Sequence, residues 1–415
     1  MAEIRPFQAI RPSRERAAEI AALPYDVYNR REAEEIVKKN PLSFLRIDRA
    51  ETNFDESVGV YDDIVYQKAH DLLWQMVEDG SFVRDEKPCY YIYELTMEGR
   101  VQTGIVACAS IDDYEKNVIK KHESTRAEKE ADRVRHIDTC NAQTGPIFLA
   151  YRGQAAIDEV VERTKKGRPL YYFTAEDGIT HRVFLIEDEA DIETIHSQFA
   201  RLDSIYIADG HHRAASAVRV GQKRRKQHPG YTGEEEFNFF LSVLFPDHQL
   251  MIMPYNRVVK DLNGLSKESF YSRIARKFDV VKRQRMPLAP GKKGKFAMFL
   301  SQHWYLCRFR QEDLSEITDP VEALDVSLLQ NLLLEPILGI TDPRTDEWID
   351  FVGGIRGLSE LERRCRTDCR VAFALYPTSI QELFAVADAG RLMPPKSTWF
   401  EPKLRSGLFI HELDR

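Results

Sequence analysis

The chain has no long apolar run, and this excludes a helix that crosses a membrane. Across its 415 residues, no window approaches the roughly 18 consecutive apolar residues that such a helix needs. The first residues, Met-Ala-Glu-Ile-Arg-Pro-Phe, also lack the apolar core of a secretory signal. We therefore expect a cytoplasmic protein with no membrane partner.

Cysteine is scarce as well. The six cysteines stand at positions 89, 108, 140, 307, 365 and 369, with no CxxC pair and no histidine at zinc spacing. This pattern argues against a structural zinc site. Cys365 and Cys369 lie one helical turn apart among arginines, and we interpret them as ordinary reduced thiols.

The chain has no excess of positive charge. Its formal net charge is −7, which disfavours broad binding to a polyanion, so we expect no nucleic-acid partner. A GxxxxGK[ST] motif and a kinase glycine loop are also missing. Any nucleotide must therefore be held by a different scaffold.

The apolar fraction of 43% is enough for a substantial core, and helical and strand-like segments follow each other in mixed order. We expect an α+β (mixed α/β) fold with an N-terminal region at 1–255 and a C-terminal region at 256–415. Expected helices cover 30–39, 61–79, 125–136, 157–163, 192–200, the residues after Gly210, 322–338 and 380–389. Expected strands cover 44–47, 89–95, 101–110, 146–151, 170–174, 181–186, 204–208, 237–245, 250–254, 296–300, 371–376 and 407–413, with 237–245 paired to 250–254.

The most informative segment is Tyr-Ile-Ala-Asp-Gly-His-His-Arg at residues 206–213. It indicates a strand that turns at Gly210 into an Ala-rich helix, whose first N–H groups and positive dipole end favour phosphate. Arg213 adds a fork of donors, and His211 and His212 can donate, accept or titrate near neutral pH. The alternative is an ordinary helix start, with Asp209 as N-cap and the histidines on the surface.

Asp209 does not suit direct phosphate binding because it carries a negative charge itself. A carboxylate at this place suits Mg²⁺ binding, orientation of a histidine, or removal of a proton from a hydroxyl.

This segment closely resembles the phosphate-binding box of the ParB and sulfiredoxin superfamily, in particular the DGHHR motif of free serine kinases. Nearly the whole chain resembles the family designated domain of unknown function 1015. Motifs shared with that family are Pro-Tyr-Asp-Val at 24–27, Asn40-Pro41 with Arg46, His-Glu-Ser-Thr at 122–125, Asp209 to Arg213, Pro-Tyr-Asn-Arg at 254–257, Met-Pro-Pro-Lys-Ser-Thr at 393–398, Phe400 and Pro402-Lys403. Asn256 departs from the His expected after Pro-Tyr, so no acid-base role is assigned to it.

The His122-Glu123-Ser124-Thr125 segment precedes a charged helix. A carboxylate beside hydroxyls and cations suits proton removal from an alcohol, with Glu123 as the base. A helix N-terminus with Ser124 or Thr125 as its cap explains the spacing equally well. The resemblance favours the functional reading, in which His122 contacts the substrate.

Two prolines stiffen the loop at 393–398, so that Lys396, Ser397 and Thr398 are presented to an anion, although a structural turn also explains the prolines. Lys396 or Lys403 would neutralise the transferred phosphoryl group. Tyr25 and Asp26 stand in a proline-initiated turn and are family-supported substrate contacts. Arg46, on an expected apolar strand, and Arg257 could clamp a carboxylate or form buried ion pairs.

The resemblance implies a phosphotransferase that uses ATP or ADP with Mg²⁺ and forms or consumes O-phosphoserine. Glu123, Asp209 and His211 are the candidate catalytic residues, and Gly210, His212, Arg213, Lys396, Ser397, Thr398 and Lys403 would bind phosphate. Two alternatives stay open: a ParB-like nucleotide switch that regulates a partner, and a phosphoserine phosphatase with the same anion site.

Overall fold

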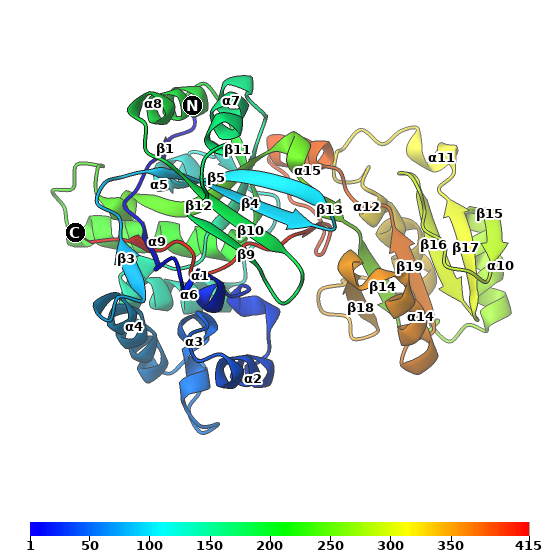
Figure 1. The fold of residues 1–415 in the computed structure, drawn as a ribbon. Coiled ribbons are helices and arrows are strands. Elements are labelled where there is room, and N and C mark those ends of the chain that lie inside the picture. Colours follow the sequence, from blue (N-terminus) through cyan, green and yellow to red (C-terminus); the bar gives the residue numbers. More distant parts are fainter. Residues whose placement is uncertain (415) are drawn as a thin grey trace. The chain divides into compact units, whose positions relative to one another are not determined.

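The computed structural model describes residues 1–414 and divides the chain into two compact units, each visible in Figure 1. Unit 1 comprises Met1–Leu250 together with the chain from Pro402 onward, and unit 2 comprises Met251–Glu401. The expected boundary after residue 255 placed the whole C-terminal end in the second region. In the structure, the chain instead returns to unit 1 at Pro402.

A mixed sheet of nine strands, counted over the described residues, forms the centre of unit 1. The strand order is β6 (Ile119–Lys120), β11 (Ile205–Asp209), β8 (Ile147–Tyr151), β12 (Phe239–Pro246), β5 (Arg100–Ser110), β4 (Tyr90–Met97), β10 (Thr180–Ile186) and β9 (Tyr171–Thr174), with β1 (Ile4–Arg5) paired to β5. β12 runs parallel to β8, and β11 runs parallel to β6, whereas the other pairs are antiparallel. The expected mixed α/β class is confirmed.

Helix α9 (His211–Gln227) packs against this sheet through its small residues. Ala214, Ala217 and Val220 belong to the same buried cluster as Ile92 and Ile105 of the central strands. Small side chains allow close approach of the helix axis, and a Cβ at Gly221 would lie 2.5 Å from the carbonyl oxygen of Phe237. The small residues of α9 thus hold the helix close to the sheet, and its N-terminus lies directly after the end of β11.

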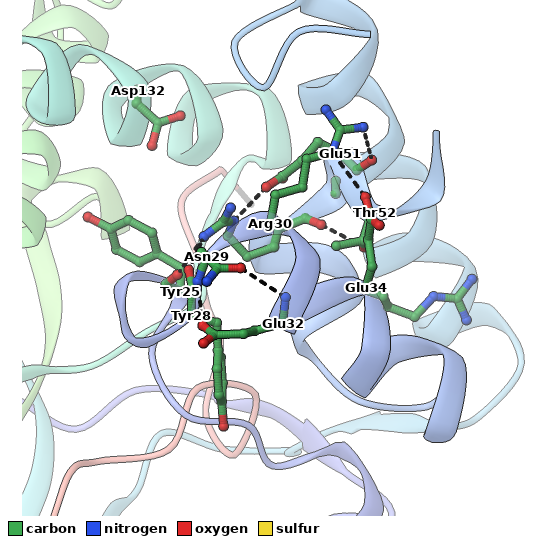
Figure 2. Close-up of polar contacts among 12 residues, drawn as sticks. Tyr25, Tyr28, Asn29, Arg30, Glu32, Glu34, Glu51, Thr52 and Asp132 are labelled. Atoms are coloured by element: carbon green, nitrogen blue, oxygen red, sulfur yellow. Dashed lines mark hydrogen bonds and ion pairs between the residues drawn. The ribbon is translucent and has the colours of Figure 1, made fainter. Parts of the chain in front are cut away.

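The other helices of unit 1 are α1 (Ala17–Ile20), α2 (Arg30–Lys39), α3 (Leu45–Asp48), α4 (Asp63–Glu78), α5 (Ile111–Glu115), α6 (Ala127–Cys140), α7 (Ala155–Thr164) and α8 (Glu189–Phe199), with 3-10 turns at Tyr25–Val27, Ala50–Asn53, Glu236–Asn238 and Asp247–Gln249. Short pairs join β2 (Ile10–Pro12) to β3 (Phe82–Arg84) and β7 (Ala142–Gln143) to β21 (His411–Glu412). Helices α2, α3 and α4 surround a second core around Phe44 and Leu73. A capping box between Asn29 and Glu32 starts α2, as Figure 2 shows.

The expected strand at 44–47 is wrong, because Leu45–Asp48 forms helix α3. In a short, mostly apolar run such as Phe44-Leu45-Arg46-Ile47, periodicity cannot distinguish a strand from a buried helical turn. Here the run is short enough for a single turn, and Leu45, Ile47 and Asp48 are all buried. The expected strand at 407–413 is likewise reduced to β21.

Unit 2 is built on an antiparallel sheet with the order β15 (Asp279–Gln284), β17 (His303–Arg308), β16 (Lys295–Leu300), β19 (Val371–Leu375), β14 (Tyr255–Val259) and β18 (Ile349–Gly353). Its helices are α10 (Lys267–Lys277), α11 (Gln311–Leu314), α12 (Asp325–Leu329), α13 (Glu335–Leu338), α14 (Gly357–Thr367) and α15 (Ile380–Asp388), with a 3-10 turn at Gly354–Arg356. The expected helix at 322–338 is interrupted by a π-helical turn at Gln330–Leu334.

The expected pairing of 237–245 with 250–254 is also wrong. β12 pairs with β5 and β8, whereas β13 (Ile252–Met253) pairs with β20 (Trp399–Phe400), far away in the sequence. Within the described part of the chain, no helix combines the length and apolarity needed to cross a membrane.

Candidate functional site

The turn between β11 and α9 brings the DGHHR residues to the start of a long helix. Gly210 has φ +93°, a conformation that residues with a side chain rarely adopt, and a Cβ there would lie 3.0 Å from Nη2 of Arg213. The glycine therefore permits both the turn and the close approach of Arg213. The first N–H groups of α9 have no carbonyl within the helix to bind, so they are available to an anion in front of it.

Asp209 at the end of β11 is held between two cations. Its Oδ2 lies 3.1 Å from Nζ of Lys403 and 3.9 Å from Nη2 of Arg213. Burial opposes ionisation of Asp209, but Lys403 and Arg213 outweigh it and hold the pKa of this carboxyl well below its usual range. Asp209 is thus a carboxylate at every physiological pH.

Two buried histidines lie beside this turn. The rings of His122 and His211 meet edge to face with their centroids 4.5 Å apart. Burial lowers the pKa of His122 to about 4, and burial together with the neighbouring His122 lowers the pKa of His211 well below its ordinary value. Both rings are neutral at pH 7. Within residues 1–414, both ring nitrogens of His211 are buried and have no hydrogen-bond partner.

The segment that contains Glu123 is held against the start of α9. Nε2 of His212 accepts a hydrogen bond of 2.9 Å from the backbone N–H of Arg126. The Ser216 hydroxyl lies 2.7 Å from the carbonyl oxygen of His212 and 3.0 Å from that of Glu130. Helices α6 and α9 pack against each other beyond these contacts. The hydrogen bond between Arg126 and His212, 86 positions apart, therefore joins the two motifs, and the half-buried Glu123 stands three residues before Arg126.

Two adjoining cavities lie next to this site in unit 1. The smaller has a volume of about 30 Å³ and is lined by Arg213; the larger has a volume of about 230 Å³. Tyr25, Asp48, Arg133 and His136 line both. The larger cavity therefore shares these four residues with the smaller cavity, which Arg213 of the DGHHR segment lines.

Arg133 and Tyr25 form the wall between the two cavities. The Arg133 guanidinium lies 4.1 Å from the centroid of the Tyr25 ring, and its Nε donates to Asp132 at 2.8 Å. The Tyr66 hydroxyl donates to Asp132 at 2.7 Å. Burial raises the pKa of Tyr25 to about 12, so its hydroxyl stays protonated.

Arg49 fixes the turn that carries Tyr25. Its Nη1 donates to the carbonyls of Tyr25 at 3.1 Å and Tyr28 at 2.6 Å, while its Nε lies 2.6 Å from the buried carboxylate of Glu51. Arg30 donates to the carbonyl of Glu51 at 3.4 Å, and Figure 2 shows Tyr25, Tyr28, Arg30 and Glu51 in this network. The turn is thus anchored by backbone contacts that leave the side chain of Tyr25 in the cavity wall.

The structure places the sequence-predicted residues in two groups. Tyr25, Asp26, His122, Glu123, Asp209, Gly210, His211, His212, Arg213 and Lys403 all belong to unit 1. Arg46 also belongs to unit 1, but it is on a helix and not on a strand, and its Nη1 donates to the carbonyl of Pro41 at 2.9 Å. Neither cavity is lined by Arg46.

Arg257, Lys396, Ser397 and Thr398 belong to unit 2. Arg257 is buried and donates to backbone carbonyls of Tyr255 and Pro395. The Ser397 hydroxyl donates to the carbonyl of Pro394 at 2.6 Å, so this side chain stabilises its own turn. Lys396 is exposed, with its Nζ 5.4 Å from the centroid of the Tyr255 ring.

The cavity residues that the sequence reasoning did not assign to a site include Asp48, Arg49, Arg133 and His136. Asp48 directly follows the segment 44–47, which was assigned to a strand. Arg133 and His136 follow Asp132 on α6 at spacings that place polar residues on one buried face of that helix, and this was the signal that could have found them.

A metal ion would depend on Asp209 and a bound phosphate together. Among residues 1–414, no group of three or more His, Cys, Asp or Glu side chains is arranged to hold a metal ion. Mg²⁺ is commonly held by only one or two carboxylates plus phosphate oxygens, and the permanently ionised Asp209 fits that donor set.

Comparison with solved structures finds distant likenesses. SbnI with C-terminal truncation from Staphylococcus aureus is 11% identical, over 71% of this chain and 82% of that one, with a TM-score of 0.37. A free serine kinase in complex with AMP is 12% identical, over 74% and 91%, with a TM-score of 0.33. A conserved hypothetical protein from Pyrococcus furiosus is 13% identical, over 75% and 95%, with a TM-score of 0.31.

A search of curated proteins finds no match. The family model of a protein of unknown function, DUF1015, matches residues 4–327. Because this match covers well over half of the 415 residues, the chain belongs to the DUF1015 family.

Proposed function

We propose that this protein transfers a phosphoryl group between a nucleotide, ATP or ADP, and the hydroxyl of a small amino acid, with L-serine and O-phosphoserine as the substrate pair. The observation that carries the proposal is the start of α9. There, Arg213 and Lys403 flank an ionised Asp209 next to the first N–H groups of the helix, and two neutral buried histidines lie alongside.

Phosphoryl transfer requires charge neutralisation and alignment more than covalent chemistry from the protein. In the proposed site, the N–H groups after Gly210, together with His212 and Arg213, bind the nucleotide phosphates. Lys403 neutralises the transferred group. Asp209 and phosphate oxygens would hold Mg²⁺, which would supply additional positive charge there.

The base that accepts the hydroxyl proton is assigned to Glu123 and not to Asp209. Lys403 and Arg213 keep Asp209 ionised and therefore make it a weak proton acceptor. The serine oxygen attacks the terminal phosphorus, the bond between phosphorus and the nucleotide oxygen breaks, and the serine proton passes to Glu123. His211 is neutral and donates a hydrogen bond to a phosphate oxygen.

The experiment is incubation of purified protein with Mg²⁺, L-serine and either ATP or ADP, followed by mass spectrometry for O-phosphoserine. We expect wild type to form the product and Asp209→Ala and Glu123→Ala to lose it. The reverse reaction, from O-phosphoserine and nucleotide, tests the direction.

Two other outcomes identify the competing functions. Release of inorganic phosphate from O-phosphoserine without nucleotide would indicate a phosphatase. Tight nucleotide binding with no transfer in either direction would indicate a nucleotide switch, and binding to a DNA duplex would strengthen that reading.

A further inference from the structure

The larger cavity of unit 1 has charged walls of both signs, and most of these charges are already paired. Arg49 pairs with Glu51, and Arg133 pairs through its Nε with Asp132. Apart from the exposed Asp26 and Lys129, what remains unpaired is one face of Arg133 and the carboxylate of Asp48, both buried and both lining the two cavities. Buried charges without full pairing are costly, so their retention points to a ligand.

The guanidinium of Arg133 has N–H groups that donate no hydrogen bond within the described residues. Arg133 is 8% exposed. Its Nε donates a hydrogen bond to Asp132, and the Tyr25 ring covers one face of its guanidinium. Across the described residues, no hydrogen bond involves its Nη1 or Nη2. Two parallel N–H donors at the surface of a cavity match the two oxygens of a carboxylate.

One carboxylate oxygen of Asp48 accepts no hydrogen bond within the described residues. Asp48 is 4% exposed, and its Oδ1 accepts a hydrogen bond of 3.0 Å from the Thr144 hydroxyl. Its Oδ2 makes no hydrogen bond to any residue in the range 1–414. Asp48 also makes no ion pair with Arg133 within 4.0 Å in that range, although its charge raises the pKa of Arg133. The carboxylate of Asp48 and the guanidinium of Arg133 therefore lie near each other at the cavities without direct contact.

His136 adds a second acceptor next to Asp48. Its Nε2 lies 3.2 Å from the carbonyl of Ile47 and so must be the protonated nitrogen, which leaves the lone pair of Nδ1 free. Burial, and then the charge of Arg133, lowers the pKa of His136 to about 4, so the ring is neutral at pH 7.

We propose that these residues bind the two charged groups of an α-amino acid, with the carboxylate on Arg133 and the ammonium on Asp48 and His136. This inference rests on the proposed function for the role of the bound amino acid as phosphoryl acceptor. Its side chain then extends toward Arg213, which lines the adjoining cavity. A polyphosphate does not suit this place because Asp26, Asp48 and Asp132 would repel it.

The first test compares three ligands on the wild-type full chain by isothermal titration calorimetry, without nucleotide. L-serine carries both charged groups, glycerate lacks the ammonium, and ethanolamine lacks the carboxylate. Loss of one charge-assisted contact is expected to weaken binding by about tenfold or more relative to L-serine. Equal binding of all three, or no binding of L-serine, would overturn the proposal without any variant.

The second test uses Asp48→Asn and Arg133→Met. Asp48→Asn keeps the partner of Thr144 and is expected to weaken L-serine and ethanolamine but not glycerate. Arg133→Met is expected to weaken L-serine and glycerate but not ethanolamine. Arg31→Met, in the exposed pair with Glu35, is the matched control for loss of an arginine, and melting curves verify the fold of each variant.

The experiments distinguish failure of the phosphotransferase proposal from failure of the amino-acid site. Specific binding of L-serine in this pattern without O-phosphoserine formation would reject the phosphotransferase and keep the amino-acid site. Formation of O-phosphoserine with an unchanged KM for L-serine in both variants would keep the phosphotransferase and overturn this site.

Discussion

Nζ of Lys403 lies 3.1 Å from Oδ2 of Asp209, although 194 positions separate the two residues. The contact exists because the chain leaves unit 1 after Leu250 and returns to it at Pro402. One consequence is that the charge state of Asp209, next to the turn at Gly210, depends on a residue far away in the sequence. The cation that keeps Asp209 ionised comes from the returning segment.

Lys403→Met should therefore reduce phosphoryl transfer by about a hundredfold, because one preorganised cation at the transferred group is lost. The pKa of Asp209 should rise in the same variant, since Lys403 is the larger of the two cationic influences that lower it. Steady-state kinetics with L-serine and nucleotide measure the first effect. Lys87→Met, in an exposed pair with Glu187, is the control, and a loss of similar size there would contradict the assignment.

Gly210→Ala should damage the anion site and cost stability. A left-handed conformation costs a residue with a side chain about 1–2 kcal/mol, and the new Cβ would push against Arg213. We expect nucleotide affinity to fall at least about tenfold, measured by calorimetry. Gly230→Ala is the control because its Cβ would meet no atom within 4 Å and its φ is not positive. Equal affinities of the two variants would show that the turn does not bind phosphate.

The buried histidines predict a loss of stability in mild acid. In the unfolded chain a histidine takes up a proton near its ordinary pKa of 6.5, whereas folded His122 resists protonation down to about 4. Its contribution is complete above pH 6.5 and is lost as the pH falls toward 4, with a slope of at most about 1.4 kcal/mol per pH unit. Urea unfolding at several pH values should give a flatter dependence for His122→Gln. His248→Gln, at a half-exposed side chain, should keep the wild-type slope.

Arg49→Lys should destabilise unit 1. An ammonium cannot reach the carbonyls of Tyr25 and Tyr28 and the carboxylate of Glu51 at once, so a buried polar group loses its partner. The expected loss is about 1–3 kcal/mol in the free energy of unfolding. Arg31→Lys alters a pair on the surface and should change it by less than about 0.5 kcal/mol. Similar values for both would contradict the anchoring role of Arg49.

Local patterns were sufficient to predict the strand, turn and helix that carry the candidate site. The apolar strand before Asp209, the glycine and the Ala-rich helix gave β11 and α9 correctly, because both elements depend on residues adjacent in the sequence. Helix α2 was predicted with its observed bounds for the same reason.

The rest depended on contacts between distant residues. Nothing near Asp48 in the sequence shows that it faces Arg133 of α6. The mostly apolar run 44–47 favoured a strand over the helical turn that buries this carboxylate. Likewise, β13 pairs with β20 and not with β12, since tertiary packing decides the pairing of such short strands.

The most direct test of the account is single-turnover transfer of a labelled terminal phosphate from nucleotide to L-serine by wild type and by Glu123→Gln. We predict labelled O-phosphoserine from wild type, and from Glu123→Gln a rate lower by about a hundredfold with unchanged nucleotide affinity, as expected for loss of a general base. Label found only in inorganic phosphate, or equal rates for the two proteins, would contradict the account.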